Sequence, residues 1–227
     1  MINVDCKAGR KFSFIPQKSA LIIVDMQRDF VDKEGACAAV GADVEPLLAT
    51  VPRIKTVLNA MRSLGLTIVC TRYGFKPDLS DLHEAVRLQS REAGGEYGTL
   101  GPLGRILTQG EAGHEIIEEL RPREDEVVID KSTFGAFCET ELESILSVRG
   151  VTHLLICGVT TQCCVEGTIR EAIDRGYFVM TLEDCCGAFE PALQEGTLRA
   201  LQSEGHLFGW VGTSSAVINA LPRAAVA

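Results

Sequence analysis

The feature that most constrains the fold of this chain is a repeated alternation between strand-sized apolar runs and stretches of helical periodicity. The apolar runs are solid, which is typical of strands that are covered on both faces. Such an alternation predicts an α/β fold, in which a six-stranded, mostly parallel sheet lies between two layers of helices. The expected strands lie at 19–27, 66–72, 125–131, 152–158, 177–184 and 206–211.

The segments between these strands predict the helices that cover the sheet. Apolar residues at three- and four-residue steps, closed by a glycine, predict a helix within 45–65. Further helices are expected at 138–150, 161–176 and 191–205. The connection at 73–112 is long and glycine-rich, and loops of that length in a compact domain are often functional lids.

Three features of the lid region and its surroundings give more local predictions. Ser80 is placed to cap a short helix. The glycine-rich stretch 92–104 is expected to be a loop, and 114–120 predicts one or two helical turns. No repeat or linker interrupts the pattern, and 227 residues suit one domain, so 1–227 is predicted to be a single domain.

The charge and the cysteines exclude several classes of function. The net charge is −9, so the chain lacks the clustered cations that bind nucleic acid or anionic lipid. The start of the chain shows no signal peptide and no apolar run could span a bilayer, which predicts a cytoplasmic protein. The nine cysteines include no C-x-x-C pair, and the four histidines are scattered, so reduced thiols are expected.

Reactive side chains follow the predicted strands at the edge where an α/β sheet binds its ligands, beyond the carboxyl ends of its strands. Asp25 follows the first strand, Arg72 the second and Lys131 the third. Cys163 and Cys164 follow the fourth. The sequence therefore brings an acid, a base and a thiol to one rim.

The two cysteines lie in the first turn of a predicted helix, where unpaired amides and the helix dipole favour a thiolate. Cys163 shares its helical face with polar residues, whereas Cys164 shares its face with small residues that leave room above the thiol. This difference favours Cys164 as a nucleophile. The structural alternative is a small apolar residue in a tight strand–helix turn.

Asp25 and Lys131 also have a chemical and a structural interpretation. Asp25 leaves an apolar strand, where desolvation favours the protonated carboxyl and suits a proton shuttle, but a capping role also fits. Lys131 beside a thiol would favour the thiolate and stabilise an oxyanion, but it could equally be a strand-end lysine that reaches solvent. The three residues together on one rim are harder to explain structurally than each one separately.

Several blocks of the sequence resemble the isochorismatase-like cysteine hydrolases, amidases with an Asp–Lys–Cys triad. The matching blocks are LIIVDMQRDF (21–30), VIDKSTFGAF (128–137), ICGVTTQCCVEGTIREAIDRGY (156–177), LEDCCGAF (182–189) and HLFGW (206–210). The resemblance implies a catalytic triad of Asp25, Lys131 and Cys164, with Cys163 in a variable position. It also implies a cis peptide between Val159 and Thr160, an oxyanion hole formed by the amides of Thr160 and Cys164, and no cofactor.

Within the family, the sequence resembles enzymes that cleave carbamoyl amides: biuret, triuret, ureidoacrylate and N-carbamoylsarcosine hydrolases. The segments 71–82 and 104–120 are most similar to the biuret and triuret enzymes, which implies a small urea-like substrate. Glu204 stands where the resemblance leads us to expect a substrate-binding glutamine. A carboxylate there would accept urea N–H groups and repel a substrate carboxylate unless Arg72 or Arg91 compensates, whereas the structural alternative is a solvated residue near a helix end.

Aromatic residues near the strand ends could line the binding site of a planar substrate, although core packing is the commoner role of phenylalanine. Phe30, Phe75 and Phe137 are therefore candidate substrate-binding residues, and Phe134 lies in the same region. Metal-dependent relatives carry Asp and His ligands after the second strand. The only histidine there is His83, its spacing to nearby aspartates does not fit, and no metal is predicted.

Family members are commonly tetramers, so a homo-oligomer, tetramer or dimer, is expected, in which a neighbouring subunit could complete the pocket. Two rival functions remain open from the sequence. One is a thiol-independent hydrolase of the same fold that cleaves a vinyl ether. The other is a non-enzymatic α/β binding protein, although GRILTQGEAG lacks the spacing of a nucleotide-binding glycine loop.

Overall fold

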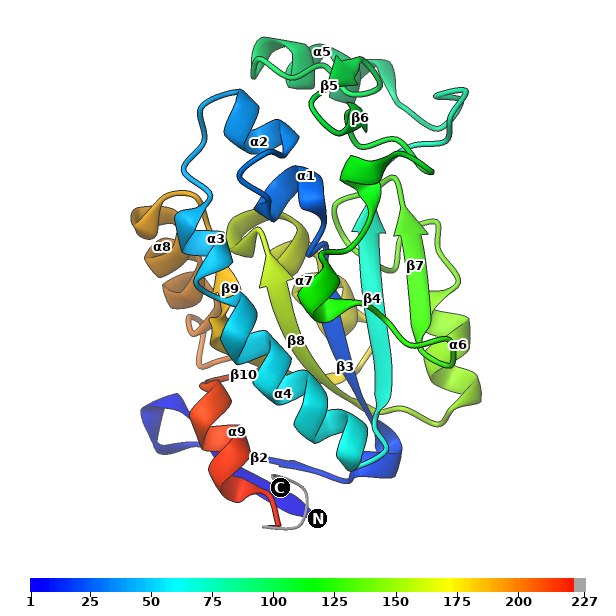
Figure 1. The fold of residues 1–227 in the computed structure, drawn as a ribbon. Helices are drawn as coiled ribbons and strands as arrows, with labels where there is room; N and C mark the ends of the chain where they lie inside the picture. Colours follow the sequence, from blue (N-terminus) through cyan, green and yellow to red (C-terminus); the bar gives the residue numbers. More distant parts are fainter. Residues whose placement is uncertain (223–227) are drawn as a thin grey trace.

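The computed structural model describes residues 1–222, and its centre is a sheet of six parallel strands in the order β10-β9-β8-β3-β4-β7 (Figure 1). Every residue of the central strand β3 is buried, as the solid apolar run predicts. All expected strands are present, so the predicted α/β fold is confirmed. They are β3 (Ser19–Val24), β4 (Thr67–Tyr73), β7 (Val127–Lys131), β8 (His153–Val159), β9 (Phe178–Gly187) and β10 (Trp210–Gly212).

Helices cover both faces of the sheet. Figure 1 shows α4 (Val51–Ser63) and α9 (Ser214–Ala220) in front of it, and α6 (Leu142–Val148) and α7 (Glu166–Asp174) behind it. The helix α8 (Pro191–Leu201) follows β9. In α4 the predicted periodic residues are buried, so hydrophobic packing onto the sheet selects this helix. They are Ile54, Val57, Leu58 and Met61.

The strand order places the carboxyl ends of β3 and β8 at a crevice. These strands are neighbours, yet β3 leads to β4 on one side and β8 leads to β9 on the other. Ligands of open α/β sheets bind where the strand order reverses in this way. The topology therefore brings Asp25, after β3, close to the cysteine turn after β8.

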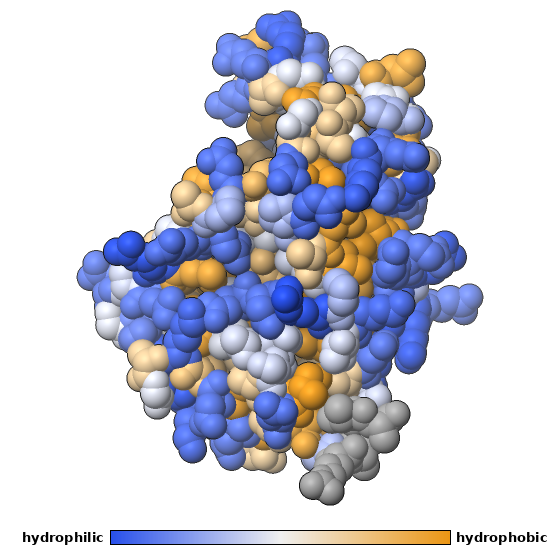
Figure 2. Space-filling model, turned by 60° about the vertical axis from the view of Figure 1, so that its left-hand side comes forward, coloured by the Kyte–Doolittle hydropathy of each residue, from blue (hydrophilic) through white to orange (hydrophobic). Residues whose placement is uncertain are grey.

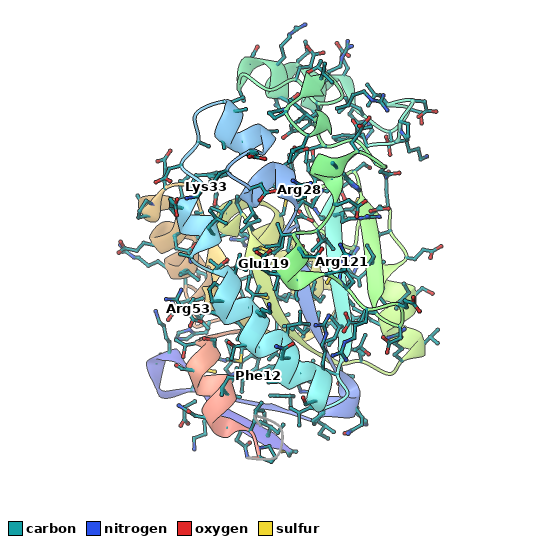
Figure 3. All side chains as sticks on the ribbon, viewed as in Figure 1. Phe12, Arg28, Lys33, Arg53, Glu119 and Arg121 are labelled. Carbon is teal, nitrogen blue, oxygen red and sulfur yellow. The ribbon has the colours of Figure 1, made fainter. Side chains whose placement is uncertain are left out.

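The amino-terminal hairpin is not foreseen by the sequence reasoning. Its strands are β1 (Ile2–Asp5) and β2 (Lys11–Phe14), and every second residue is buried. Phe12 of this hairpin lies at the lower end of the molecule in Figure 3, whereas Arg28 and Lys33 lie nearer the upper end. The hairpin therefore lies far from the rim that carries Asp25.

The long connection forms the upper part of the molecule in Figure 1, beyond the carboxyl ends of the strands. It contains α5 (Glu84–Glu92) and the two-residue strands β5 (Leu100–Gly101) and β6 (Gly104–Arg105). The short α1 (Arg28–Val31), α2 (Ala36–Ala39) and α3 (Glu45–Leu48) lead from β3 toward α4. No helix within residues 1–222 is both long enough and apolar enough to span a membrane.

Several element boundaries differ from the predictions. The helix expected from Ser80 begins at Glu84, because the Asp78 carboxylate accepts the Ser80 amide (3.0 Å) and holds a turn there. The expected loop 92–104 contributes a β5–β6 hairpin, and the helix expected from 161 begins as a π-helical turn, Thr161–Val165.

Candidate active site

Asp25 is fully buried directly after β3, in a left-handed backbone conformation with φ 49°. Its Oδ2 lies 2.7 Å from Nζ of Lys131. Its Oδ1 accepts a 2.5 Å hydrogen bond from the Thr71 hydroxyl, which in turn accepts the Asp25 amide at 3.2 Å. A buried carboxylate is therefore bound at both oxygens, which offsets its loss of hydration.

Lys131 ends β7 and is equally buried. Its ammonium donates to the carbonyls of Thr133 and Phe134, both at 3.0 Å, and lies 4.9 Å from the centre of the Tyr73 ring. Burial acts to lower the pKa of Lys131, but the Asp25 carboxylate, together with the neighbouring Cys164 and Cys163 thiols, more than offsets it, so the pKa is raised above its usual value. Lys131 is therefore a charged group inside the protein, and the alternative of a solvent-exposed lysine is wrong.

The cysteine turn follows β8 through a cis peptide between Val159 and Thr160. The Thr160 carbonyl accepts the amides of Cys163 (3.1 Å) and Val165 (3.2 Å). Within residues 1–222, neither the Thr160 nor the Cys164 amide donates to an oxygen outside the π-helical turn. No acceptor outside the turn therefore competes with a ligand for these two amides.

The two thiols of the turn differ in burial and in acidity. Cys164 is 5% exposed and Cys163 is half-buried. A hydrogen bond between them, together with burial, raises the pKa of Cys164, while the Lys131 ammonium opposes the rise. The same hydrogen bond lowers the pKa of Cys163. The raised pKa keeps the Cys164 thiol protonated in the resting site, so attack by this sulfur requires a base.

Arg72 does not point toward this site. Side chains alternate along a strand, and its neighbours Thr71 and Tyr73 face Asp25 and Lys131. The Arg72 guanidinium lies on the other face of β4 and binds Asp130 at 2.7 and 3.0 Å. It also binds Glu115 at 3.1 Å. The prediction that Arg72 binds substrate is therefore not supported by its position.

Glu204 also lies away from the site. It is exposed in the turn after α8, and α8 runs from the carboxyl end of β9 toward the amino end of β10. The opposite end of the same helix carries Gln194, whose Nε2 donates to the carbonyls of Glu183 and Cys186, both at 3.1 Å. Its Oε1 accepts the Thr161 hydroxyl. Gln194, which the sequence reasoning missed, therefore fixes the cysteine turn.

The remaining predicted substrate-binding residues divide into two groups. Phe30 and Phe75 pack around Tyr73, with ring centres at 6.5 and 5.4 Å. Phe137 instead packs against Tyr177 at 5.7 Å, and Arg91 is exposed on α5, so neither reaches the Asp25–Lys131 pair.

Tyr73, Phe134 and Tyr97 complete the aromatic group, which we call the aromatic wall: Phe30, Tyr73, Phe75, Tyr97 and Phe134. Phe134 stacks on Tyr73 at 5.6 Å and Tyr97 lies 6.0 Å from it. Strand alternation could have identified Tyr73, because it stands two residues after Thr71. Tyr97 lies in the lid region, and no local pattern indicates its contact with Tyr73.

Gln27 joins the lid region to the sheet beside this wall. Its side chain accepts the Tyr73 amide at 2.7 Å and donates to the Tyr73 carbonyl at 2.9 Å and to the His114 carbonyl at 3.1 Å. The sequence reasoning did not select Gln27. No cluster of three or more His, Cys, Asp or Glu side chains within residues 1–222 could hold a metal ion.

Comparison with known proteins identifies the family. The family model for the Isochorismatase domain matches residues 19–216, which include the whole sheet and the cysteine turn. The chain belongs to the isochorismatase family. Ureidoacrylate amidohydrolase RutB of Klebsiella pneumoniae subsp. pneumoniae is 32% identical over 222 residues, which cover 94% of this chain and 91% of the relative.

Solved structures show the same family fold. A cysteine hydrolase from Pseudomonas syringae pv. phaseolicola has a TM-score of 0.78 and 28% identity, and the match covers 92% of this chain and 94% of that one. N-carbamoylsarcosine amidase from Thermoplasma acidophilum shares the fold, with a TM-score of 0.65, 24% identity and coverage of 87% and 96%. The predictions of an isochorismatase-like cysteine hydrolase and of a linear-amide hydrolase are confirmed at the level of this family.

Proposed function

We propose that the protein is a cysteine-dependent amidohydrolase that cleaves a small carbamoyl amide of the biuret or triuret type and releases ammonia. The observation that carries the proposal is the buried Asp25–Lys131 ion pair beside the turn of Cys164. Both charges act electrostatically on the Cys164 sulfur. A pair of desolvated charges next to a protonated thiol suits proton transfer followed by nucleophilic attack.

In the first half-reaction, Asp25 removes the proton of the Cys164 thiol and the sulfur attacks the substrate carbonyl. A C–S bond forms and the carbonyl oxygen becomes an oxyanion. The amides of Thr160 and Cys164 donate to this oxyanion, and the Lys131 ammonium lends positive charge nearby. When the tetrahedral intermediate collapses, the C–N bond breaks and Asp25 returns its proton to the departing ammonia.

In the second half-reaction, Asp25 takes a proton from water and the resulting hydroxide attacks the thioester. The C–S bond then breaks, the product acid leaves, and the Cys164 sulfur regains the proton. No cofactor takes part in these steps. Lys131 keeps its charge throughout, because the carbonyls of Thr133 and Phe134 hold it in place.

The charges near the site support a neutral substrate. Lys131 is already paired with Asp25, and Arg72 is bound by Asp130 and Glu115. Neither cation is free to bind a substrate carboxylate, and an unpaired buried carboxylate is costly. This distribution of charge favours biuret or triuret over an anionic carbamoyl compound.

A second candidate is an amidohydrolase of the ureidoacrylate or N-carbamoylsarcosine type. The 32% identity with a ureidoacrylate amidohydrolase over almost the whole chain favours it. A screen for ammonia release with biuret, triuret, ureidoacrylate, N-carbamoylsarcosine and nicotinamide separates the candidates. We expect turnover of the neutral carbamoyl amides, and turnover of ureidoacrylate alone would replace our proposal with the second candidate.

The nucleophile is tested by comparing the two adjacent cysteines. Cys164→Ala should abolish ammonia release, whereas Cys163→Ala should retain most of it. Iodoacetamide should inactivate the wild type, and substrate should protect it. Equal losses in the two variants would contradict the assignment, and activity without Cys164 would favour a thiol-independent hydrolase.

We also propose a homo-oligomer, a tetramer or a dimer, as the resemblance to the family implies. Light scattering coupled to gel filtration measures its mass directly. A monomeric mass at the concentration of the activity assay would refute this proposal.

A further inference from the structure

A cavity of about 120 Å³ lies beside the aromatic wall, between the α1–α2 segment and the lid region. Figure 1 places α2 and α5 beyond the carboxyl ends of the strands, and Figure 2 shows apolar side chains where the upper part of the molecule meets the body. The lining comes from two stretches, 29–40 and 90–107. Asp25, Lys131 and Cys164 do not line it, so the cavity is distinct from the catalytic group.

Two polar side chains in the cavity wall, those of Asp29 and Ser90, are already satisfied by the protein. Asp29 accepts the Leu107 amide at 2.8 Å and the Ala36 amide at 3.4 Å. Ser90 donates to the Arg87 carbonyl at 2.9 Å and accepts the Tyr97 amide at 3.2 Å.

The thiol of Cys37, also in the wall, is neutral because burial raises its pKa to about 12. Burial likewise raises the pKa of the Tyr97 phenol, so it too is neutral. No lysine or arginine is among the lining residues within 1–222. The wall therefore offers an apolar ligand dispersion contacts, and it offers an anion no partner.

Two residues of the aromatic wall connect the cavity to the catalytic end of the sheet. Phe30 and Tyr97 line the cavity, and their rings also pack against Tyr73 at 6.5 and 6.0 Å. The Tyr73 ring in turn lies 4.9 Å from the Lys131 ammonium.

The Tyr73 hydroxyl itself is buried and has no hydrogen-bond partner within residues 1–222. A polar group left in this state calls for a ligand partner. The Tyr73 ring therefore packs against both the Lys131 ammonium and the cavity residues Phe30 and Tyr97, and its buried hydroxyl lacks a partner within residues 1–222.

We propose that this cavity binds a neutral apolar substituent of the substrate, and that the Tyr73 hydroxyl binds the polar group from which the substituent extends. The inference depends on the proposed amidohydrolase function and narrows its substrate class to acylureas, R–CO–NH–CO–NH₂, of which biuret is the member with an amino group as R. A cavity of 150 Å³ holds benzene, so about 120 Å³ suits a branched chain of about four carbons.

The first test compares ammonia release from acetylurea, propionylurea and isovalerylurea. Burying each added carbon should raise kcat/KM about fourfold, so isovalerylurea should exceed acetylurea on the order of 50-fold. Succinylurea, which carries a terminal carboxylate, should have the lowest kcat/KM of the series, because no lysine or arginine is among the cavity residues within 1–222. Equal kcat/KM values for acetylurea and isovalerylurea would overturn the proposal.

Gly95 offers a variant that fills the cavity. A Cβ there would lie 3.4 Å from Cγ1 of Val40 and 3.9 Å from Cδ1 of Ile106, both cavity residues. In Gly95→Leu, kcat/KM for isovalerylurea should exceed that for acetylurea by no more than about threefold. Gly95→Ala should give a ratio of the two kcat/KM values between those of Gly95→Leu and the wild type.

Gly196→Leu is the matched control, because a Cβ at that exposed helical position meets nothing within 4 Å. Gly196→Leu should keep the full wild-type increase in kcat/KM from acetylurea to isovalerylurea. A gain that survives Gly95→Leu would refute the assignment of the cavity.

Binding to the Cys164→Ala variant separates this inference from the proposed function. Calorimetry should show isovalerylurea binding more tightly than acetylurea by the same factor of about fourfold per carbon. If no compound releases ammonia, the proposed function fails, and this affinity series then decides the cavity alone. Equal affinities for acetylurea and isovalerylurea would overturn the proposed role of the cavity. An affinity that rises with chain length, and that no longer rises when Gly95→Leu is added, would support this role.

Discussion

The buried ion pair between Asp25 and Lys131 gives the most direct test of the site's energetics. Lys131→Met keeps the length and apolar stem of the side chain but leaves the Asp25 carboxylate buried without its charged partner. Removing one member of a buried pair typically costs about 3–5 kcal/mol. The carbonyls of Thr133 and Phe134 lose their donor as well, so a loss in the upper half of this range is expected.

The double variant Asp25→Asn/Lys131→Met separates the two sources of this loss. Neutralising the carboxylate removes the cost of the unpaired charge, so the double variant should recover about 2 kcal/mol relative to Lys131→Met. The rest of the loss should remain, because the two carbonyls still lack a donor. Recovery of stability by a second substitution is the signature of a buried pair.

Urea unfolding followed by circular dichroism at pH 7.5 measures these differences in the free energy of unfolding. Lys11→Met is the control, because Lys11 pairs with Asp5 at 3.7 Å on the surface and both side chains are exposed. It should change stability by less than about 1 kcal/mol. A Lys131→Met loss as small as that of Lys11→Met, or a double variant less stable than Lys131→Met, would refute the reasoning.

Three further outcomes follow from the structure. Gly158→Ala should lower the free energy of unfolding, measured with urea, by more than about 2 kcal/mol, because its Cβ would lie 2.1 Å from the Val24 carbonyl oxygen. Gly110→Ala is the control: Gly110 also has a positive φ, but a Cβ there meets nothing within 4 Å, so the loss should be smaller. Burial lowers the pKa of His114 in the folded protein, so as the pH falls this histidine is protonated in the unfolded chain before it is protonated in the folded one. The free energy of unfolding should therefore fall by up to about 1.4 kcal/mol per pH unit below about pH 6.5. His114→Leu should flatten this pH dependence, and an unchanged slope would contradict the assignment. Gln194→Ala should lower stability by about 1–3 kcal/mol and reduce kcat, because two carbonyls and the Thr161 hydroxyl lose their partner; wild-type kcat in an ammonia assay would show that Gln194 does not fix the turn.

The sequence by itself determined the features that depend on local patterns. Solid apolar runs gave all six strands, and parallel strands place their carboxyl ends on one edge, so Asp25, Lys131 and the cysteine turn could be assigned to the same rim. The motif blocks identified the family. These predictions hold because burial on both faces of a strand and the direction of a parallel sheet follow from the order of residues alone.

Only the tertiary structure decided which side chains meet. A shift of one residue along β4 reverses the face of the sheet, so Thr71 and Tyr73 contact the ion pair while Arg72 faces away. The direction of α8 carries Glu204 to the far end of the sheet and leaves Gln194 beside the cysteine turn. Packing between Tyr97 and Tyr73 joins segments that are distant in sequence, and no local pattern records such a contact. The sequence therefore determined which residues lie at the carboxyl edge of the sheet, whereas long-range packing of the folded chain decided which of their side chains meet in the site.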